Sequence, residues 1–428
     1  MEVIRNTYSV CPVCLQRIPA QHVRENNEIF LKKSCPTHGD FSCIIWRGRL
    51  PIEAWRGPLP EICEGENENC PHHCGLCDEH KQGTCCVVLE VTDRCNLGCT
   101  YCFADPAGSA DASLEQVTEW LRDLIEPGQT LVQLSGGEPT VRDDLPEIVR
   151  RAKSLGAAYV QLNTNGLRLA EDEDYAATLA QAGLSFVFLQ FDAAQDDSVY
   201  RALRGRPLLS EKLRAIENCA RCGLGVTLVP TLVRGVNLDE IGPILQFAIA
   251  HSPTVRGVHF QPVSYFGRVP TMPDDAARYT LDELVDDLVR QSDGLLRMQD
   301  IAPSRCDHPL CGFHGDFIVL PDNRLLPLTK SKVQNECSCS TPEQNRAFVS
   351  RRWERSTGDM KIESGEEHDI HSFDGFLKRA RTHGFTITSM PFQDRWNLDL
   401  ERLRQCSLHV YDRGRWVPFC SYYLGGPQ

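Results

Sequence analysis

Three cysteines placed directly after an apolar run constrain this sequence more than any other feature. Cys95, Cys99 and Cys102 follow the run that ends at Thr92, with the spacing Cys-x3-Cys-x2-Cys. Three thiolates are one fewer than a closed tetrahedral zinc site needs. They suit a [4Fe–4S] cube, which is held by cysteine, with one iron left open to bind a substrate. A zinc knuckle with a remote fourth ligand is the alternative, and the preceding strand and the following motifs favour the cube.

The region 86–295 alternates apolar, strand-like runs with amphipathic helical stretches. The six runs that we expect to be strands are Cys86–Thr92, Gln133–Ser135, Tyr159–Leu162, Phe186–Phe191, Val226–Val229 and Val258–Gln261. The clearest helices are residues 114–125, 145–155 and 238–250, and we expect Asp143 or Asp144 to cap the second. Strand–helix alternation predicts an α/β fold with a parallel sheet and right-handed crossovers. Six units are too few for the closed eight-fold barrel.

Polar residues gather where the expected strands end, which is where such folds place their functional groups. Gly136, Gly137, Glu138 and Pro139 follow the second strand. Glycines let a backbone approach a ligand closely, and the Glu138 carboxylate can accept a hydrogen bond from an ammonium group. Further cofactor-binding candidates, in the cysteine loop and at later strand ends, are Tyr101, Asn163, Asn165, Gln190, Asp192 and Thr231. A ligand-free turn, a helix cap or plain packing is the alternative for these positions.

The triad spacing, the Gly-Gly-Glu-Pro turn at 136–139 and the Thr-Asn-Gly sequence at 164–166 together resemble the radical S-adenosylmethionine (radical SAM) superfamily. The resemblance implies an open (β/α)6 partial barrel. It also implies that the three cysteines hold a catalytic [4Fe–4S] cluster whose free iron chelates S-adenosyl-L-methionine (SAM), with Tyr101 beside the adenine. One electron, from a flavodoxin- or ferredoxin-type donor, then splits SAM into methionine and a 5′-deoxyadenosyl radical.

The N-terminal region carries a separate metal signature. Cys11-Pro-Val-Cys14 and Cys35-Pro-Thr-His38 form two knuckles with the spacing of a zinc-ribbon or rubredoxin-like site. Cys43 competes with His38 for the fourth position. A set of three cysteines and one histidine favours zinc, whereas four cysteines suit iron or zinc. We expect this mononuclear metal to hold a small domain together.

Two further groups of cysteines flank the expected barrel. The first group comprises Cys70, Cys74, Cys77 and Cys85, with Cys63 and Cys86 as substitutes. Its spacing suits a closed auxiliary [4Fe–4S] cluster. It also competes for the catalytic role, but only the triad follows the first strand of the barrel.

The second group comprises Cys306, Cys311, Cys406 and Cys420, with Cys337 and Cys339 as substitutes. These cysteines form two pairs far apart in the sequence, and we expect the fold to bring them together as a second auxiliary cluster. Cys219 and Cys222 lie on an expected helix, where buried thiols without a ligand are common.

Composition and charge restrict the class of protein. The chain has 21 cysteines among its 428 residues. A chain of this length is too long for a small disulfide scaffold, so the cysteine count favours metal ligation in a reducing cytoplasm. The formal net charge of −13 argues against a broad nucleic-acid surface. No apolar run reaches the length of a transmembrane helix, and the N-terminus lacks the pattern of a signal peptide. We expect a cytoplasmic protein without a transmembrane segment or nucleic-acid partner.

These features divide the chain into four parts. They are a metal domain at 1–60, an auxiliary-cluster segment at 61–86, the partial barrel at 87–300 and a C-terminal auxiliary-cluster domain at 301–428. The ordered series of cysteine groups is similar to the radical SAM group that contains the archaeal tetraether lipid synthase, also called class D radical SAM methylases. The resemblance implies three [4Fe–4S] clusters, one mononuclear zinc or iron, and radical C–C bond formation at an unactivated sp3 carbon.

The sequence does not distinguish between a lipid-like substrate and another small molecule. The chain is shorter at its C-terminal end than the lipid synthase and has no long apolar helix for a lipid. His259, Gln261 and Tyr265 are the candidate residues for substrate contact. The alternatives are a C-methylase that uses a folate- or pterin-borne carbon, an enzyme that modifies a peptide, and an iron–sulfur electron carrier without catalysis.

Overall fold

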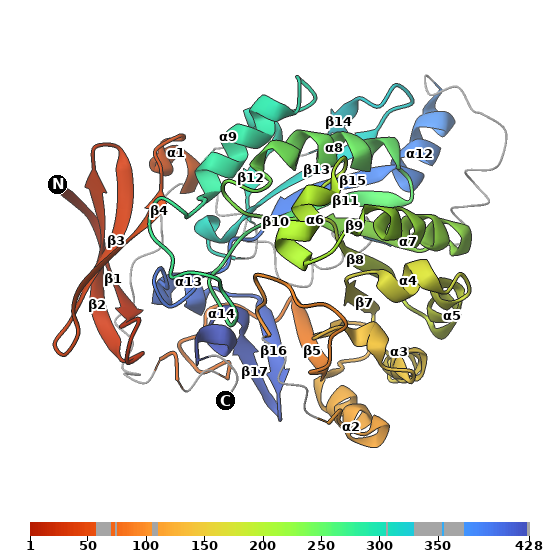
Figure 1. The fold of residues 1–428 in the computed structure, drawn as a ribbon, viewed down its shortest axis with the longest axis horizontal. Helices are drawn as coiled ribbons and strands as arrows, with labels where there is room; N and C mark the ends of the chain where they lie inside the picture. The colour runs from red at the N-terminus through yellow and green to blue at the C-terminus, as the bar shows by residue number, and fades with distance from the viewer. Residues whose placement is uncertain are drawn as a thin grey trace.

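The computed structural model describes residues 1–56, 70–72, 75–104, 110–304, 307–328, 353–354 and 372–425. Figure 1 shows a small N-terminal sheet at one end of the molecule and a large central sheet with helices along its outer face. The strands of the central sheet and the loops that follow them surround a cavity of about 410 Å³.

The N-terminal sheet is antiparallel, in the order β1 (Glu2–Val10), β2 (Arg17–Glu25), β3 (Glu28–Cys35) and β4 (Gly39–Trp46). Asn26 and Asn27 connect β2 to β3 with positive φ angles of 56° and 103°, which two-residue hairpin turns require and asparagine tolerates. The other two turns carry the expected metal knuckles. A short helix, α1 (Ile52–Arg56), follows this sheet.

Six parallel strands form the centre of the large sheet. Their order is β5 (Cys86–Thr92), β6 (Leu131–Gly136), β7 (Tyr159–Thr164), β8 (Phe186–Gln190), β9 (Gly225–Val229) and β11 (Val255–Pro262). They are the six runs expected from the sequence, and β5 has the predicted bounds. A two-residue strand, β10 (Thr231–Leu232), pairs with the end of β11.

Helices between these strands cover the outer face of the sheet (Figure 1). They are α2 (Leu114–Leu124), α3 (Leu145–Ser154), α4 (Leu167–Glu171), α5 (Tyr175–Ala182), α6 (Asp197–Arg204), α7 (Leu209–Cys222), α8 (Ile241–Ala250) and α9 (Leu281–Gln291). Each presents an apolar stripe to the sheet; in α2 the stripe is Val117, Leu121 and Leu124, all buried. Complete burial of one such side chain is worth about 1.5–3 kcal/mol, so the helices hold the strands firmly.

Strands from the C-terminal region extend the parallel sheet at both of its edges. β15 (Gly384–Ser389) pairs in parallel with β11, and β16 (Leu408–Asp412) pairs in parallel with β5 at the opposite edge. The antiparallel strands outside them are β12 (Ala302–Pro303), β13 (Phe313–Val319), β14 (Leu325–Pro327) and β17 (Arg415–Pro418). The six expected parallel strands therefore gain a seventh and an eighth, which the sequence did not reveal.

The remaining described elements connect these strands. The helices are α12 (Phe373–Thr382), α13 (Leu400–Arg404) and α14 (Phe419–Tyr422). The 3-10 turns are Pro139–Val141, Leu238–Glu240, Met298–Asp300, Pro309–Cys311 and Tyr423–Gly425.

One local expectation was wrong, and another is confirmed only in its position. The stretch 238–250 is not one helix, because the 3-10 turn at Leu238–Glu240 precedes α8. Asp144 is the N-cap residue of α3, but its side chain makes no capping bond. Its carboxylate instead accepts hydrogen bonds from Arg142 Nε and Nη2, at 2.8 and 2.7 Å.

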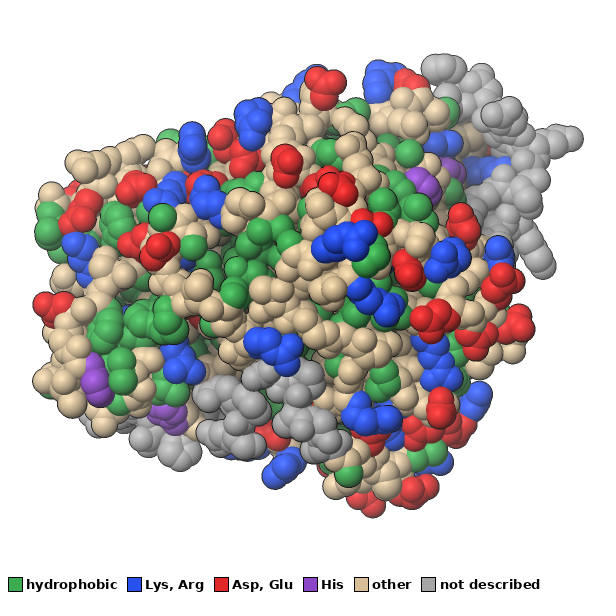
Figure 2. Space-filling model, in the orientation of Figure 1, with side chains coloured by type: hydrophobic (Ala, Val, Ile, Leu, Met, Phe, Trp, Pro, Cys, Tyr) green, Lys and Arg blue, Asp and Glu red, His purple; other side chains and the backbone are tan. Residues whose placement is uncertain are grey.

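The surface and the helices of the described residues add two observations. Acidic and basic side chains are interspersed over the face seen in Figure 2, and neither kind gathers there into one broad patch among the described residues. No helix in the described ranges combines the length and the apolar composition needed to cross a bilayer.

Candidate functional site

The cavity of about 410 Å³ lies inside the curved sheet, where the parallel strands end. The expected residues that line it are Cys95, Cys99, Tyr101, Cys102, Gly136, Gly137, Glu138, Asn163, Asn165, Gln190 and Thr231. His259 and Gln261 line it as well, whereas Pro139, Asp192 and Tyr265 do not. The fold thus brings most of the expected cofactor-binding residues around one space.

The loop that carries the cysteine triad is held on two sides. Thr100 donates its backbone N–H to the Leu203 carbonyl at the end of α6, at 2.9 Å. Cys102 pairs with Arg268 through two backbone hydrogen bonds of 3.0 and 3.1 Å. Burial raises the pKa of Cys95 to about 11. A bound iron would stabilise such a thiolate, so three half-buried thiols on one cavity fit a cysteine-held cluster.

The Gly136–Gly137 pair has a structural reason in this fold. A Cβ on Gly136 would lie 2.2 Å from the Thr92 carbonyl oxygen, and one on Gly137 would lie 2.3 Å from the Arg94 carbonyl oxygen. The end of β6 therefore packs directly on the end of β5. This contact places the triad loop beside Glu138, whose N–H donates to the Arg94 carbonyl at 2.8 Å.

Glu138 ties the ends of two strands together. Its Oε1 accepts hydrogen bonds from the Thr140 N–H, the Thr140 hydroxyl and the Thr164 hydroxyl, at 3.1, 2.6 and 2.6 Å. Its Oε2 accepts the Asn165 N–H at 2.7 Å. A carboxylate oxygen has two lone pairs, so Oε2 keeps one acceptor position for a ligand.

Asp192 is buried behind the cavity rather than in its lining. It is 0% exposed, and its carboxylate accepts hydrogen bonds from Arg204 Nε and Nη2, both at 2.8 Å, and from the Thr231 N–H at 3.0 Å. The expected contact of Asp192 with a cofactor is thus replaced by an ion pair. Arg204 itself lines the cavity; burial lowers its pKa, but the charges of Asp192 and Cys99 outweigh burial and hold that pKa above its usual value.

Sequence reasoning missed Arg204 and Lys212 as parts of the site. Arg204 lies between Arg201 and Arg206 in the sequence, and these two are exposed whereas Arg204 is buried. Lys212 is 0% exposed, and its Nζ donates to Gln190 Oε1 at 3.0 Å and to the Asn165 carbonyl. Burial lowers the pKa of Lys212 to about 8. Both lie on helices, where a charged residue is usually solvent-exposed.

The far end of the cavity joins His259 and Gln261, which the sequence suggested, with Phe188 and Trp353, which it did not. Trp353 lies with its ring centroid 4.8 Å from that of Phe188 and donates from Nε1 to Thr386 Oγ1 at 2.8 Å. His259 Nδ1 lies 2.8 Å from Thr388 Oγ1, and burial lowers the pKa of His259 to about 4. The side chain is therefore neutral at physiological pH. This end combines an aromatic wall with polar groups from β11, β13 and β15.

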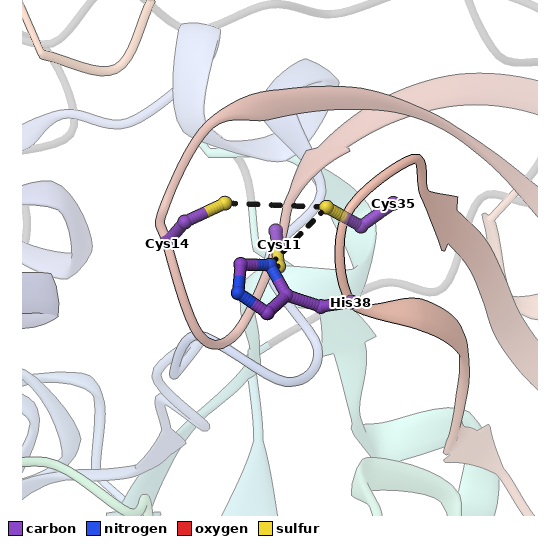
Figure 3. Close-up of side chains that lie close together, drawn as sticks. All are labelled: Cys11, Cys14, Cys35 and His38. Carbon is purple, nitrogen blue, oxygen red and sulfur yellow. Dashed lines mark hydrogen bonds between the residues drawn. The ribbon is translucent and has the colours of Figure 1, made fainter.

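The two N-terminal knuckles converge on one small centre (Figure 3). The ligand atoms of Cys11, Cys14, Cys35 and His38 all lie within 4.8 Å of one another. His38 Nδ1 is 3.6 Å from Cys11 Sγ and 3.5 Å from Cys35 Sγ, and the Cys14 and Cys35 sulfurs are 4.0 Å apart. Tetrahedral zinc separates its nitrogen and sulfur ligands by roughly 3.5–4 Å, so the geometry fits a single ion.

Cys43 does not belong to this centre. It lies inside β4, its thiol faces the Ile44 carbonyl at 3.6 Å, and burial raises its pKa to about 12. His38 therefore completes the set, which has the three-cysteine, one-histidine composition that favours zinc.

The first auxiliary group is only partly described, because Cys74 and its substitute Cys63 lie outside the described residues. Cys70 packs in an apolar cluster with Phe419 and Cys420. Cys85 lines the cavity, and its N–H donates to the Ser407 carbonyl at 2.8 Å. Cys77 is half-buried.

In the second auxiliary group, Cys311, Cys406 and Cys420 are described, while Cys306, Cys337 and Cys339 lie outside the described residues. Burial raises the pKa of Cys406, and the charges of Asp307, Cys420 and Cys311 raise it further. Burial also raises the pKa of Cys420 to about 12, with Cys311 adding to the effect. These thiols come from three separate segments, and the second auxiliary cluster stays a prediction.

Comparison with known proteins agrees with this geometry. Residues 89–248 match the family model of the radical SAM superfamily, and residues 3–47 match that of the HMPTM N-terminal zinc ribbon domain. The GTP 3′,8-cyclase of Lactiplantibacillus plantarum is 32% identical over 184 residues, covering 41% of this chain and 54% of the relative. The solved structure of Streptococcus suis SuiB with its precursor peptide SuiA has a TM-score of 0.40 and 17% identity, over 50% of this chain and 47% of that one.

One relative matches almost the whole sequence. The 7,8-dihydro-6-hydroxymethylpterin dimethyltransferase of Methanocaldococcus jannaschii is 32% identical over 475 aligned residues, which cover 98% of this chain and 93% of the relative. The cysteine triad in the loop after β5, the metal-binding ribbon and this full-length match lead to one conclusion. The chain is a radical SAM enzyme and belongs to the family of the 7,8-dihydro-6-hydroxymethylpterin dimethyltransferase.

Proposed function

We propose that this enzyme methylates a pterin-like bicyclic heterocycle, forming a C–C bond at an sp3 carbon by radical SAM chemistry. The full-length match to a protein named as a pterin dimethyltransferase supports this substrate class over a lipid. The single observation that carries the proposal is the composition of the cavity. It joins the cysteine triad to an aromatic and polar chamber of a size typical for small-molecule sites, which span about 300–1,000 Å³.

The triad end of the cavity suits SAM. We assign Cys95, Cys99 and Cys102 to a [4Fe–4S] cluster, which when bound supplies the electron for cleavage of SAM. The remaining acceptor position of Glu138 Oε2 suits the ammonium group of SAM. Gln190 and Thr231, on the next strands along the cavity wall, can hydrogen-bond its polar groups.

The far end suits a flat heterocycle with several hydrogen-bonding edges. Phe188 and Trp353 offer ring surface for stacking. Gln261, neutral His259 and the carboxylate of Asp316 line the same space. A pterin presents ring N–H and amino donors together with a carbonyl acceptor, so amide, imidazole and carboxylate groups match it better than they match a hydrocarbon chain.

We further propose two auxiliary [4Fe–4S] clusters and the four-part division of the chain described above. Cys70, Cys74, Cys77 and Cys85 would hold the first cluster, and Cys306, Cys311, Cys406 and Cys420 the second. Cys311 and Cys420 raise the pKa of Cys406, and Cys311 raises that of Cys420, which supports the assignment of the second set. A flavodoxin- or ferredoxin-type protein remains the proposed electron donor.

The test is anaerobic turnover of the reconstituted enzyme with SAM, a reductant and 6-hydroxymethyl-7,8-dihydropterin. We expect 5′-deoxyadenosine and a pterin product that is heavier by one CH2 per transferred carbon, both detected by mass spectrometry. Cys95→Ala removes one cluster ligand and should abolish both products, whereas Cys222→Ala, on the outer helix α7, should abolish neither. Formation of 5′-deoxyadenosine without any pterin product would support the radical chemistry and contradict the proposed pterin substrate.

The source of the transferred carbon is settled by isotope tracing. Incubation with methyl-deuterated SAM, and separately with a deuterated methylene-folate, shows which donor labels the product. Label from the folate supports a folate-borne carbon, and label from SAM supports direct use of its methyl group.

A further inference from the structure

The floor of the cavity is a layer of residues from neighbouring strands of the large sheet. Successive register partners carry this layer across the sheet, from Asn163 through Phe188, Thr227, Gly257 and Thr386 to Asp316. Register partners on adjacent strands share one face of a sheet. The members that line the cavity are Asn163, Phe188, Thr386 and Asp316. Phe188 and Thr386 both lie before the last residue of their strands, Gln190 and Ser389, so the floor lies deeper than the strand ends.

Asp316 is the acidic member of this floor. It lies on β13, is 3% exposed and has Thr386 as its register partner. Thr386 Oγ1 accepts the Trp353 Nε1–H at 2.8 Å, and the centroid of the Trp353 ring lies 4.8 Å from that of Phe188. Thr386 thus connects a buried carboxylate to two aromatic rings at one end of the cavity.

The other lining carboxylates belong to different parts of the cavity. Glu138 accepts its four hydrogen bonds beside the triad loop. Asp307 Oδ1 accepts the N–H and the hydroxyl of Ser407, both at 2.8 Å. Among the described residues, Asp316 is therefore the lining carboxylate that lies beside the aromatic rings.

A carboxylate places two acceptor oxygens side by side. It matches a donor group that presents two parallel N–H bonds, as in paired arginine–carboxylate contacts. Because a carboxylate has roughly four lone-pair positions, it can keep a protein partner and still accept two N–H groups from a ligand. A pterin presents such a pair of donors on one edge, namely the 2-amino group and the N3–H of its pyrimidine ring.

The opposite edge of the pterin carries the carbons that can react. In a 7,8-dihydro-6-hydroxymethylpterin, the sp3 carbons are C7 and the hydroxymethyl carbon, and both belong to the pyrazine side. A pterin whose amino edge is held on the floor presents its pyrazine side to the strand ends. The triad loop follows the end of β5 and lines the same cavity.

We propose that Asp316 determines the specificity of the enzyme for the 2-amino-4-oxo pyrimidine edge of its substrate, by accepting hydrogen bonds from the 2-amino group and N3–H. This contact turns the sp3 carbons toward the triad. The inference rests on the proposed pterin substrate. In a lumazine, which has an oxygen in place of the 2-amino group, the carboxylate would face a carbonyl oxygen and neither would gain a hydrogen bond.

The test compares 6-hydroxymethyl-7,8-dihydropterin with 6-hydroxymethyl-7,8-dihydrolumazine as substrates of the full-length, anaerobically reconstituted enzyme. We expect the unaltered enzyme to favour the pterin in kcat/KM by roughly 100-fold or more, because a site built for a donor group rejects an analogue that lacks it. Equilibrium dialysis of both compounds gives the same comparison for binding without turnover.

Asp316→Asn should reverse the preference. An amide offers one donor and one acceptor, which match the 2-oxo group and the N3–H of the lumazine. We expect this variant to favour the lumazine and to keep cleaving SAM to 5′-deoxyadenosine. Asp322→Asn is the matched control, because it makes the same change in the exposed turn after β13, and it should keep the preference for the pterin.

The outcomes separate this inference from the proposed function. Equal kcat/KM of the unaltered enzyme for the two compounds overturns the inference, even if Asp316→Asn fails to fold. An unchanged preference for the pterin in a folded Asp316→Asn that still cleaves SAM also overturns it. In both cases methylation of the pterin still supports the proposed function. If the unaltered enzyme cleaves SAM but neither binds nor methylates either compound, the proposed pterin substrate is wrong, and the role of Asp316 is wrong with it.

Discussion

Arg204 and Asp192 form a two-pronged ion pair directly behind the cysteine triad, with Nε–Oδ2 and Nη2–Oδ1 distances of 2.8 Å. Arg204 also donates to Thr231 Oγ1 at 3.0 Å. Both charged groups are buried, so each depends on the other to offset its desolvation. The pair fixes the end of α6, on which the triad loop rests.

We expect Arg204→Met to destabilise the protein by about 3–5 kcal/mol, because it leaves the Asp192 carboxylate buried without its partner. Arg204→Lys keeps the charge but loses the paired geometry and should weaken SAM binding with a smaller loss of stability. Urea unfolding and equilibrium SAM binding measure the two effects. Arg201→Met, on the exposed side of the same helix, is the control and should change both by little.

The glycine contact between β5 and β6 gives a second prediction. In Gly137→Ala the new Cβ would lie 2.3 Å from a backbone oxygen, so the strand ends must separate. We expect a loss of about 1–3 kcal/mol in stability and of most SAM cleavage, measured as 5′-deoxyadenosine. Gly98→Ala adds a methyl group in the triad loop where no atom lies within 4 Å, and it should cleave SAM like the unaltered enzyme. Equal activity of the two variants would contradict this reading of the Gly-Gly pair.

The ribbon metal allows a prediction about its ligands. His38→Ala removes one of the four converging ligands, and we expect the protein to lose most of its mononuclear metal. Cys43→Ser removes a thiol of the same domain that faces the Ile44 carbonyl, and the metal should stay bound. Zinc quantitation per chain by mass spectrometry separates the outcomes. Loss of zinc in Cys43→Ser but not in His38→Ala would reverse the assignment of the fourth ligand.

The buried His259 predicts a pH dependence of stability. Burial lowers its pKa to about 4 in the folded protein, against about 6.5 in the unfolded chain. Below pH ~6.5 the unfolded state binds a proton that the folded state does not, so stability is complete above that pH and falls progressively toward pH ~4. We expect His259→Gln to show a shallower decrease in melting temperature between pH 7 and pH 5. A decrease as steep as that of the unaltered protein would show that His259 does not contribute to it.

The central strands were predictable because they carry long apolar runs. Cys86–Thr92 and Tyr159–Leu162 begin where β5 and β7 begin, since strands buried on both sides read as continuous hydrophobic segments. The partners of the later strands were not predictable in this way. Leu408–Asp412 reads as a short strand, but nothing in its composition indicates that it pairs with Cys86–Val88 rather than with a near neighbour.

The site was predictable where its chemistry depends on spacing, and not where it depends on tertiary contacts. The triad and the two ribbon knuckles are local patterns. The triad residues line one cavity, and the knuckle residues converge on one centre. Arg204 and Lys212 were missed because a helix usually exposes its charged residues, and only the packing of α6 and α7 shows that these two face inward. The choice between His38 and Cys43 depended on which one β4 buries away from the knuckles.

The position of β16 beside β5 has a consequence for synthesis of the chain. During translation, the first barrel strand leaves the ribosome long before residues 408–412, so one margin of the nascent barrel stays open until those residues have been made. β15 closes the opposite margin almost as late. An open strand margin is prone to wrong pairing. Insertion of iron and sulfide into the triad should therefore follow synthesis of β15 and β16, and expression at a slower rate should raise the yield of correctly loaded protein.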